Sequence, residues 1–158
     1  MHIRHPEPKD YDRIIAVVND WWGGRLMSDM LPKLFFVHFH DTSFIAEKDG
    51  EIIGFLVGFL SQTFPDEAYV HFVGVHPDFR KQGIGRTLYE HFFEVARQRG
   101  RSVVRCVTAS VNKESIAFHR RIGFQIEPQN VNLDGIPVYQ NYDGPGNDRV
   151  LFLKRLPG

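Results

Sequence analysis

The stretch that decides the fold runs Val70-His71-Phe72-Val73-Gly74-Val75-His76-Pro77-Asp78-Phe79-Arg80-Lys81-Gln82-Gly83-Ile84-Gly85-Arg86. Its first six residues are strand-like, and a helix-like run begins near Gly83. Glycine has no side chain, so Gly83 and Gly85 allow the backbone to come close to a ligand. Amides at the start of a helix have no partner within it, and the helix dipole attracts anions there. With Arg80, Lys81 and Arg86 alongside, the stretch predicts a pyrophosphate-binding turn for a nucleotide-bearing ligand.

Two familiar phosphate-binding motifs do not fit this turn. A P-loop needs Gly-x-x-x-x-Gly-Lys-Ser/Thr, whereas Gly85 is followed by Arg86-Thr87 with a different glycine spacing. A dinucleotide-binding fingerprint needs a third glycine, and position 88 is Leu.

Residues 73–85 instead resemble the first motif of the GNAT acyltransferase superfamily, in which Arg/Gln-x-x-Gly-x-Gly/Ala follows a hydrophobic strand. Downstream, Asn112-Lys113-Glu114-Ser115-Ile116-Ala117-Phe118-His119-Arg120-Arg121-Ile122-Gly123-Phe124 is similar to the family's second signature of an Asn, a short helix and Gly-Phe. Two motifs in this order are far more specific than either alone.

The composition is that of an ordinary soluble globular protein. The chain has 158 residues, 42% hydrophobic and 24% charged, which predicts a single domain over residues 1–158. Nineteen basic residues balance nineteen acidic ones, so no overall field would recruit nucleic acid or an anionic membrane. The single cysteine, Cys106, excludes an internal disulfide, and no run reaches the ~20 apolar residues of a membrane span. The N-terminus has no signal-peptide core, so we expect a cytoplasmic protein.

The pattern of the chain predicts an α+β fold: a mixed, mostly antiparallel central sheet flanked by helices. We expect helices over 10–19, 27–40, 84–99 and 112–121, the second of them interrupted by a loop. Strands are expected over 2–5, 43–47, 51–62, 67–75, 103–108, from 123, and over 149–153, with a hairpin turn at Asp49-Gly50. The segment 127–148 is rich in Asn, Asp, Gly and Pro and is expected to be irregular, and either functional or mobile. This order matches the GNAT fold over essentially the whole chain.

The resemblance implies acetyl-coenzyme A as the acetyl donor and transfer to a primary amine in a ternary complex, without an acyl-enzyme. It places the donor pyrophosphate on the amides of Gln82, Gly83, Ile84, Gly85 and Arg86, with Arg80 and Lys81 supplying charge. The pantetheine arm would pair with the backbone of Val73 and Val75, between strands that splay apart. Gly74 would suit a local bulge, and the Val75 amide would stabilise the oxyanion. Asn112 and Ser115 would contact the donor, although both could simply cap a helix.

Catalytic groups are expected at three positions. Many family members carry a tyrosine four residues before Gly-Phe as the acid that protonates the leaving thiolate, and here that position is His119. The alternative is a histidine with no catalytic task. In the strand from Glu67, alternation places Glu67, Tyr69, His71 and Val73 on one face. Because Tyr69 cannot act as a base at neutral pH, His71 or Glu67 is the expected base.

The acceptor is expected to contact Trp22, Arg25, Tyr69, Tyr139 and Tyr142, because the family places its first helices and its last long loop around this substrate. His38-x-His40-Asp41 lacks a third ligand at standard spacing, so no metal is expected. Family members are often dimers, which makes a homodimer a further expectation.

Two alternatives from other classes stay open. The chain could be a non-catalytic acyl-coenzyme A sensor, because His119 and Tyr69 stand where the family often has a tyrosine and a carboxylate. It could also be a protein-interaction domain that uses the aromatic residues between 21 and 36 as a binding patch.

Overall fold

A seven-stranded sheet forms the centre of the molecule, in a computed structural model that describes residues 1–157. Its strand order is β1-β2-β3-β4-β5-β9-β6, and every neighbouring pair is antiparallel except β4 and β5. The strands are β1 His2–Arg4, β2 Phe44–Lys48, β3 Glu51–Leu60, β4 Glu67–Val75, β5 Val103–Ala109, β6 Gln125–Ile126 and β9 Arg149–Arg155. The predicted α+β class is confirmed.

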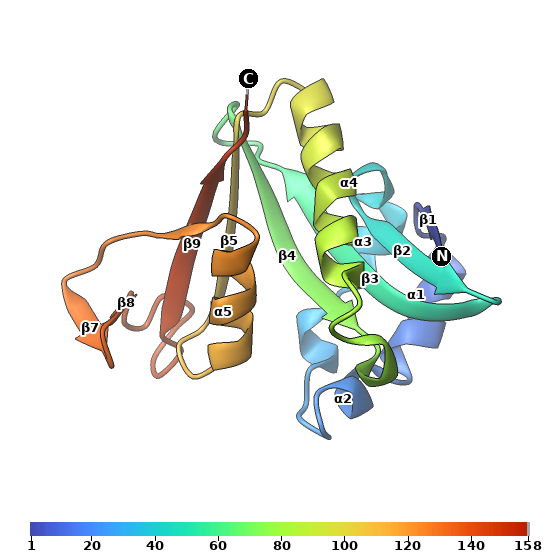
Figure 1. Cartoon of the computed structure of the whole chain (residues 1–158), viewed down its shortest axis with the longest axis horizontal. Coiled ribbons are helices and arrows are strands. Elements are labelled where there is room, and N and C mark those ends of the chain that lie inside the picture. Colours follow the sequence, from blue (N-terminus) through green and yellow to red (C-terminus); the bar gives the residue numbers. More distant parts are fainter. Residues whose placement is uncertain (158) are drawn as a thin grey trace.

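Helices cover both faces of this sheet (Figure 1). One face carries α1 Pro8–Ile15, α2 Val18–Trp21 and α3 Leu34–Val37, whose apolar side chains pack on Phe55 and Phe72. The other carries α4 Ile84–Gln98 and α5 Lys113–Arg121 over a second core with Leu88, Phe92 and Phe152. Three 3-10 turns connect these elements: η1 Ser28–Met30, η2 His40–Thr42 and η3 Pro77–Phe79.

The predicted helices over 10–19 and 27–40 are wrong in extent. The first breaks after Ile15 and resumes as α2, where the Asn19 side chain accepts hydrogen bonds from the amides of Met27 and Ser28 and so fixes the following turn. In the second region only the four-residue α3 is α-helical. Its two phenylalanines, Phe35 and Phe36, are buried in the core.

The segment 127–148 is more ordered than predicted. It contains a separate two-stranded sheet of β7 Val131–Leu133 and β8 Ile136–Val138. A loop after β8 is held by its own hydrogen bonds: Asp148 accepts from the amide of Asn141, and Asn141 accepts from the amide of Gly146. Arg149 Nε donates to Asp143 at 2.8 Å, which ties the loop to β9.

A bulge in β4 lies at His71 rather than at the predicted Gly74. Val57 pairs with Phe72 and Gly58 with Val70, so His71 is the extra residue. The bulge switches the alternation: Tyr69 and His71 contact the α1–α3 side, while Val73 packs into the α4 core. The expectation that Glu67, Tyr69, His71 and Val73 share one face is therefore wrong for Val73. Gly74 serves packing, because a Cβ there would lie 2.6 Å from the Phe55 ring.

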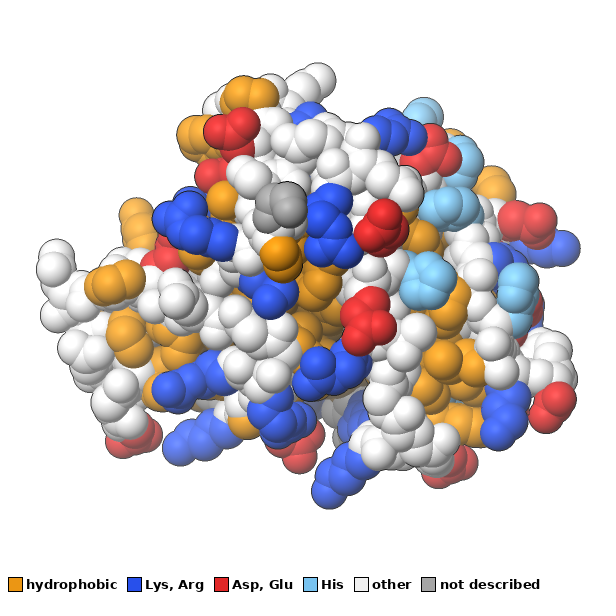
Figure 2. Space-filling view, turned by 45° about the horizontal axis from the view of Figure 1, so that its top comes forward, with side chains coloured by type: hydrophobic (Ala, Val, Ile, Leu, Met, Phe, Trp, Pro, Cys, Tyr) orange, Lys and Arg blue, Asp and Glu red, His pale blue; other side chains and the backbone are white. Residues whose placement is uncertain are grey.

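The described residues carry no helix that is long and apolar enough to cross a membrane. Basic and acidic side chains are interspersed on the face shown in Figure 2, and histidines gather along one side of it. Within residues 1–157, no three His, Cys, Asp or Glu side chains lie close enough together to hold a metal ion.

Candidate functional site

The two parallel strands β4 and β5 pair over only three residues. The pairs are Glu67 with Val103, Ala68 with Val104 and Tyr69 with Arg105; beyond them the strands diverge (Figure 1). The separation leaves the β5-facing edge of β4 without a strand partner from Val70 onward. This matches the splay that the resemblance implied.

Backbone groups of Val73 and Val75 point into this split. The amide of His76, just after β4, donates to the carbonyl of Ile53 on β3 at 2.8 Å, which fixes the direction of the alternate residues before it. Hydrogen-bonded pairs alternate along an antiparallel ladder, so Gly74 pairs with β3 while Val73 and Val75 turn their N–H and C=O groups toward β5. An extended ligand arm placed in the split would find the amides of Val73 and Val75 and the carbonyl of Val73 available, as one more strand would, whereas the carbonyl of Val75 already accepts from Arg80 Nε at 3.2 Å.

The loop between β4 and α4 lies at the open end of the split. Gly83 caps α4 with a φ of 81°, and Lys81 adopts a φ of 64°. The first helical bond runs from Thr87 N to Gly83 O, so the amides of Ile84, Gly85 and Arg86 have no partner within the helix. These amides and the exposed side chains of Lys81 and Arg86 form a turn suited to binding an anion, called the anion-binding turn below.

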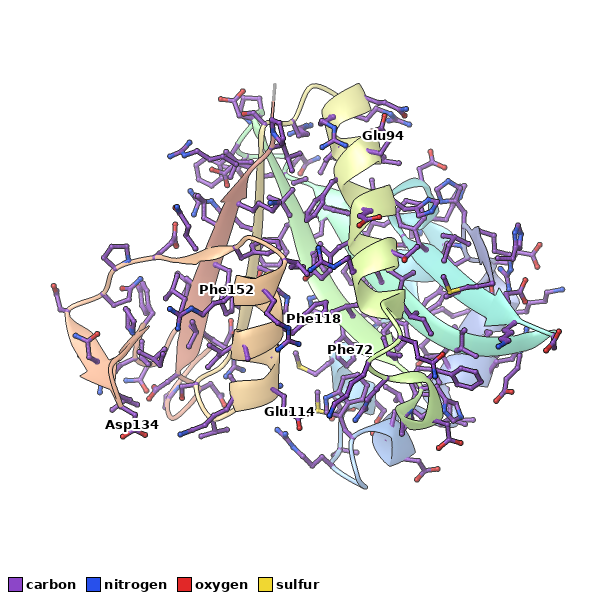
Figure 3. All side chains as sticks on the ribbon, viewed as in Figure 1. Phe72, Glu94, Glu114, Phe118, Asp134 and Phe152 are labelled. Carbon is purple, nitrogen blue, oxygen red and sulfur yellow. The ribbon has the colours of Figure 1, made fainter. Side chains whose placement is uncertain are left out.

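Arg80 and Gly85 have contacts within the protein besides the expected contact with a donor pyrophosphate. The Arg80 side chain donates to the carbonyls of Val75, at 3.2 Å, and Trp21, so it braces the end of β4 against α2. Gly85 also serves helix packing, since a Cβ there would lie 3.0 Å from Phe118 Cζ and the Phe118 ring would have to shift. Figure 3 shows Phe118 reaching from α5 toward α4.

His119 lies in the core, contrary to the expected role as thiolate acid. Its side chain stacks on Phe152, and the residue is 4% exposed. Nδ1–H donates to the carbonyl of Ser115 at 2.7 Å, so Nε2 accepts from the Tyr89 hydroxyl at 2.7 Å. Burial lowers the pKa of His119 to about 4, so the ring is neutral and has no proton on Nε2 to give. The geometry gives this histidine a structural role.

Asn112 and Ser115 take part in the same local network. Asn112 is the N-cap of α5, and its side chain accepts from the Ser115 amide at 3.2 Å. The Ser115 carbonyl orients His119. Both residues therefore have structural tasks, and their contact with a donor stays a prediction.

A cavity of about 260 Å³ opens where β4 and β5 begin to diverge, on the face opposite α4. Its lining includes Glu67 and Tyr69 from β4, Arg105 and Val107 from β5, Glu127, and Tyr142 from the late loop. Arg105 Nε donates to Glu67 at 2.8 Å, and Arg105 also bonds to Glu127. Burial raises the pKa of Tyr69 well above its usual range, so this phenol stays protonated.

Only three of the expected acceptor-side residues line this cavity: Glu67, Tyr69 and Tyr142. Tyr139 stands behind Tyr142, with ring centroids 5.0 Å apart, while Trp22 packs on Phe72 and Arg25 is exposed. His71 stacks on Phe35 and donates from Nε2 to the carbonyl of Met30 at 2.6 Å.

Sequence reasoning missed Arg105 and Glu127. Arg105 follows Val103 and Val104 in an otherwise apolar strand, and a charge inside such a strand was the available signal. A larger cavity of about 350 Å³, beside Phe124 and Ile136, lies under β8 and away from the split.

Residues 8–124 match the model of the Acetyltransferase (GNAT) family. The chain belongs to this family.

An uncharacterized N-acetyltransferase of Methanocaldococcus jannaschii is 36% identical over 89 residues, which are 54% of this chain and 39% of that protein. The L-2,4-diaminobutyric acid acetyltransferase of Nocardia farcinica is 32% identical over 95 residues, 58% of this chain and 49% of that protein. The chain thus spans half or less of the length of these two relatives. The structure of yncA from Salmonella typhimurium, solved with its cofactor acetyl-CoA, has a TM-score of 0.67 at 20% identity, and covers 100% of this chain and 95% of that one. This GNAT chain shares the fold of the yncA structure.

Proposed function

We propose that the chain moves an acetyl group from acetyl-CoA to the nitrogen of a primary amine, with both substrates bound together. The observation that carries the proposal is the three-pair ladder between β4 and β5, which leaves a slot with free backbone groups beside an anion-binding helix start. Ser115 Oγ lies 3.3 Å from His119 Nδ1, but this nitrogen donates to the Ser115 carbonyl and so cannot take the hydroxyl proton, and Cys106 is buried; both facts are in keeping with direct transfer.

The residues around the slot suit the donor. The amides of residues 82–86 would hold the pyrophosphate, with Lys81 and Arg86 adding charge, and Arg80 could join only by leaving its carbonyl partners. The backbone of Val73 and Val75 would pair with the pantetheine arm. When bound, acetyl-CoA supplies an activated acetyl thioester. The Val75 amide, turned toward the slot, is the proposed hydrogen-bond donor to the thioester carbonyl.

On the acceptor side we propose Glu67 as the base that receives the proton of the incoming ammonium. Its carboxylate lines the cavity and is held in place by Arg105. His71 supports this role less well, because it does not line the cavity and its Nε2 is engaged with Met30. Tyr69 and Tyr142 would form walls around the amine.

The two alternatives differ in their support. The interaction-domain alternative relied on exposed aromatic residues between 21 and 36. Trp21, Phe35 and Phe36 are each at most 5% exposed, and Trp22 is half-buried against Phe72. The sensor reading keeps one specific observation, the burial of His119. Turnover separates a sensor from a catalyst.

The first experiment is the melting temperature with acetyl-CoA, coenzyme A and AMP, followed by thiol release across a panel of amines. A ligand that binds only the folded state at ~100 times its Kd adds about 2.7 kcal/mol. We expect stabilisation by both coenzyme A species and little by AMP. Absence of any shift would contradict the donor assignment, and a shift without thiol release on any amine would favour the sensor. A cytoplasmic location and a homodimer stay predictions.

A further inference from the structure

The acceptor cavity is lined by more acidic than basic side chains, and this excess of negative charge affects which amines can bind. Three charged side chains line it: Glu67, Arg105 and Glu127. Arg105 is the last residue of β5 that pairs with β4. Its side chain bonds to both carboxylates, that of Glu67 on β4 and that of Glu127 just after β6. We call this set the Arg105 triad.

The triad carries two carboxylates for one guanidinium, a formal charge of about −1. Its side chains are 20–31% exposed, so water screens them less than it screens surface charges. Among the described residues that line the cavity, Arg105 is the only cation, and it already faces two anions. A substrate carboxylate brought here would be the third anion around a single guanidinium.

The rest of the lining favours a cationic or neutral amine. Tyr69 and Tyr142 offer aromatic faces, which attract cations, and Glu67 and Glu127 offer oxygens that accept N–H bonds. The volume of about 260 Å³ falls below the usual range for drug-sized ligands, so the cavity suits a short chain or a single side-chain-sized group.

Resting on the function proposed above, we infer that the acceptor is a primary amine without a carboxylate beside it, and that the Arg105 triad enforces this choice. Simple amines, diamines and amino-acid amides, which keep a free amine but have no carboxylate, fit the cavity, whereas free amino acids meet repulsion. This separates the chain from its diaminobutyric acid-acetylating relative, whose named substrate carries a carboxylate next to one amine.

The test uses two pairs of acceptors that differ only at the carboxylate. These are 1,3-diaminopropane against L-2,4-diaminobutyric acid, and L-alaninamide against L-alanine. Acetyl transfer is followed by thiol release and by product mass. We expect kcat/KM to be at least about tenfold higher for the partner without the carboxylate, which corresponds to about 1.4 kcal/mol. Equal values, or a preference for the carboxylate partners, would overturn the inference.

The variant Glu127→Gln removes one anion and frees one side of Arg105. We expect the tenfold ratio to shrink towards one, through improved use of L-alanine and L-2,4-diaminobutyric acid. Glu94→Gln is the matched control, because Glu94 also pairs with an arginine, Arg97, but on the exposed surface of α4 (Figure 3). An unchanged ratio in Glu127→Gln, with circular dichroism of a folded protein, would also contradict the inference.

Failure of the proposed function is distinguished from failure of this inference by titration calorimetry, which measures amine binding to the coenzyme A complex. If no amine is acetylated, the function fails, and the binding of L-alaninamide against L-alanine still decides the inference. Tighter binding of L-alaninamide supports it, and equal or weaker binding overturns it.

Discussion

In the proposed reaction, Glu67 of the Arg105 triad is the base that receives the proton of the acceptor amine. Its carboxylate is partly buried and is held at 2.8 Å by Arg105, the last residue of β5 that pairs with β4 before the two strands separate. A base must be both oriented and close to the amine, and this arrangement supplies the orientation.

Replacing this carboxylate should remove proton transfer while keeping the side-chain volume. We expect Glu67→Gln to lower kcat about a hundredfold with little change in the KM for acetyl-CoA, because the donor binds at the other end of the slot. His71→Ala should lower kcat by less. Steady-state kinetics with Glu94→Gln as the control would check both, and a larger loss in His71→Ala would reverse the assignment.

His119 belongs to the stability of the fold, and its titration should show this. Its folded pKa is about 4 against 6.5 in the unfolded chain, so the unfolded state binds the proton more readily between these values. Stability is therefore complete above pH 6.5 and falls by about 3 kcal/mol as the pH drops to 4.

The double variant His119→Phe with Tyr89→Phe removes both partners of the buried hydrogen bond. The double variant should keep most of the stability at pH 7, should no longer lose stability between pH 6.5 and 4, and should retain kcat. His119→Phe alone leaves the buried Tyr89 hydroxyl without its hydrogen-bond acceptor, which costs about 1–3 kcal/mol of stability. Urea unfolding at several pH values measures each effect. A loss of kcat in a stable double variant would restore the acid role.

Residue type and position together predicted that residue 119 lies on a helix before Gly-Phe, and this is confirmed. What the sequence does not reveal is the direction of the ring. That direction is set by Tyr89, thirty residues earlier on α4, and by the stack on Phe152 of β9. Neither contact leaves a local pattern, so tertiary packing decides the orientation of the His119 ring.

At the scale of elements, α4 is flanked by two glycines, Gly83 and Gly100, that share the left-handed backbone conformation. Gly83 and Gly100 have φ values of 81° and 76°, and a Cβ at either would meet nothing within 4 Å. The predicted end of the helix at Gly100 is confirmed. Only Gly83 lies at the anion-binding turn, so the two glycines form a natural pair for comparison.

We expect Gly83→Ala and Gly100→Ala each to cost about 1 kcal/mol, a drop of about 3 °C in Tm, because alanine is strained at positive φ. Only Gly83→Ala should also raise the KM for acetyl-CoA, since relaxing its φ turns the amides of the first turn. Calorimetry and kinetics measure the two effects. Equal donor KM values in the two variants would mean that this turn does not hold the donor.

The strands show where pattern reading works and where it fails. The hairpin at Asp49-Gly50 and the β4–α4 unit follow from turn chemistry and periodicity, and both are confirmed. In β4 the alternation looks unbroken in the sequence, yet the bulge at His71 moves Val73 to the other face. A bulge adds one residue without altering composition, so it becomes visible only in the register with β3.

At the scale of the whole molecule, the slot separates two substrate sides. The anion-binding turn and α4 lie on one side of the sheet, and the Arg105 triad lies on the other. The two substrates can then approach from opposite faces and meet between β4 and β5, which direct transfer requires. In the proposed function, a strand pair that is joined at one end and open at the other is both the scaffold and the binding site.

This arrangement predicts an unusual pattern of amide hydrogen exchange in the middle of a sheet. The amides of Phe72 and Gly74 pair with β3 and should exchange slowly, whereas those of Val73 and Val75 face the slot and should exchange much faster in the free protein. Coenzyme A should slow Val73 and Val75 selectively, because its pantetheine arm would take the place of the missing strand, and AMP should leave both unchanged. Exchange measured by NMR resolves each residue. Slow exchange at Val73 in the free protein would show that the slot closes in solution, and uniform slowing by AMP would assign the protection to the anion-binding turn alone.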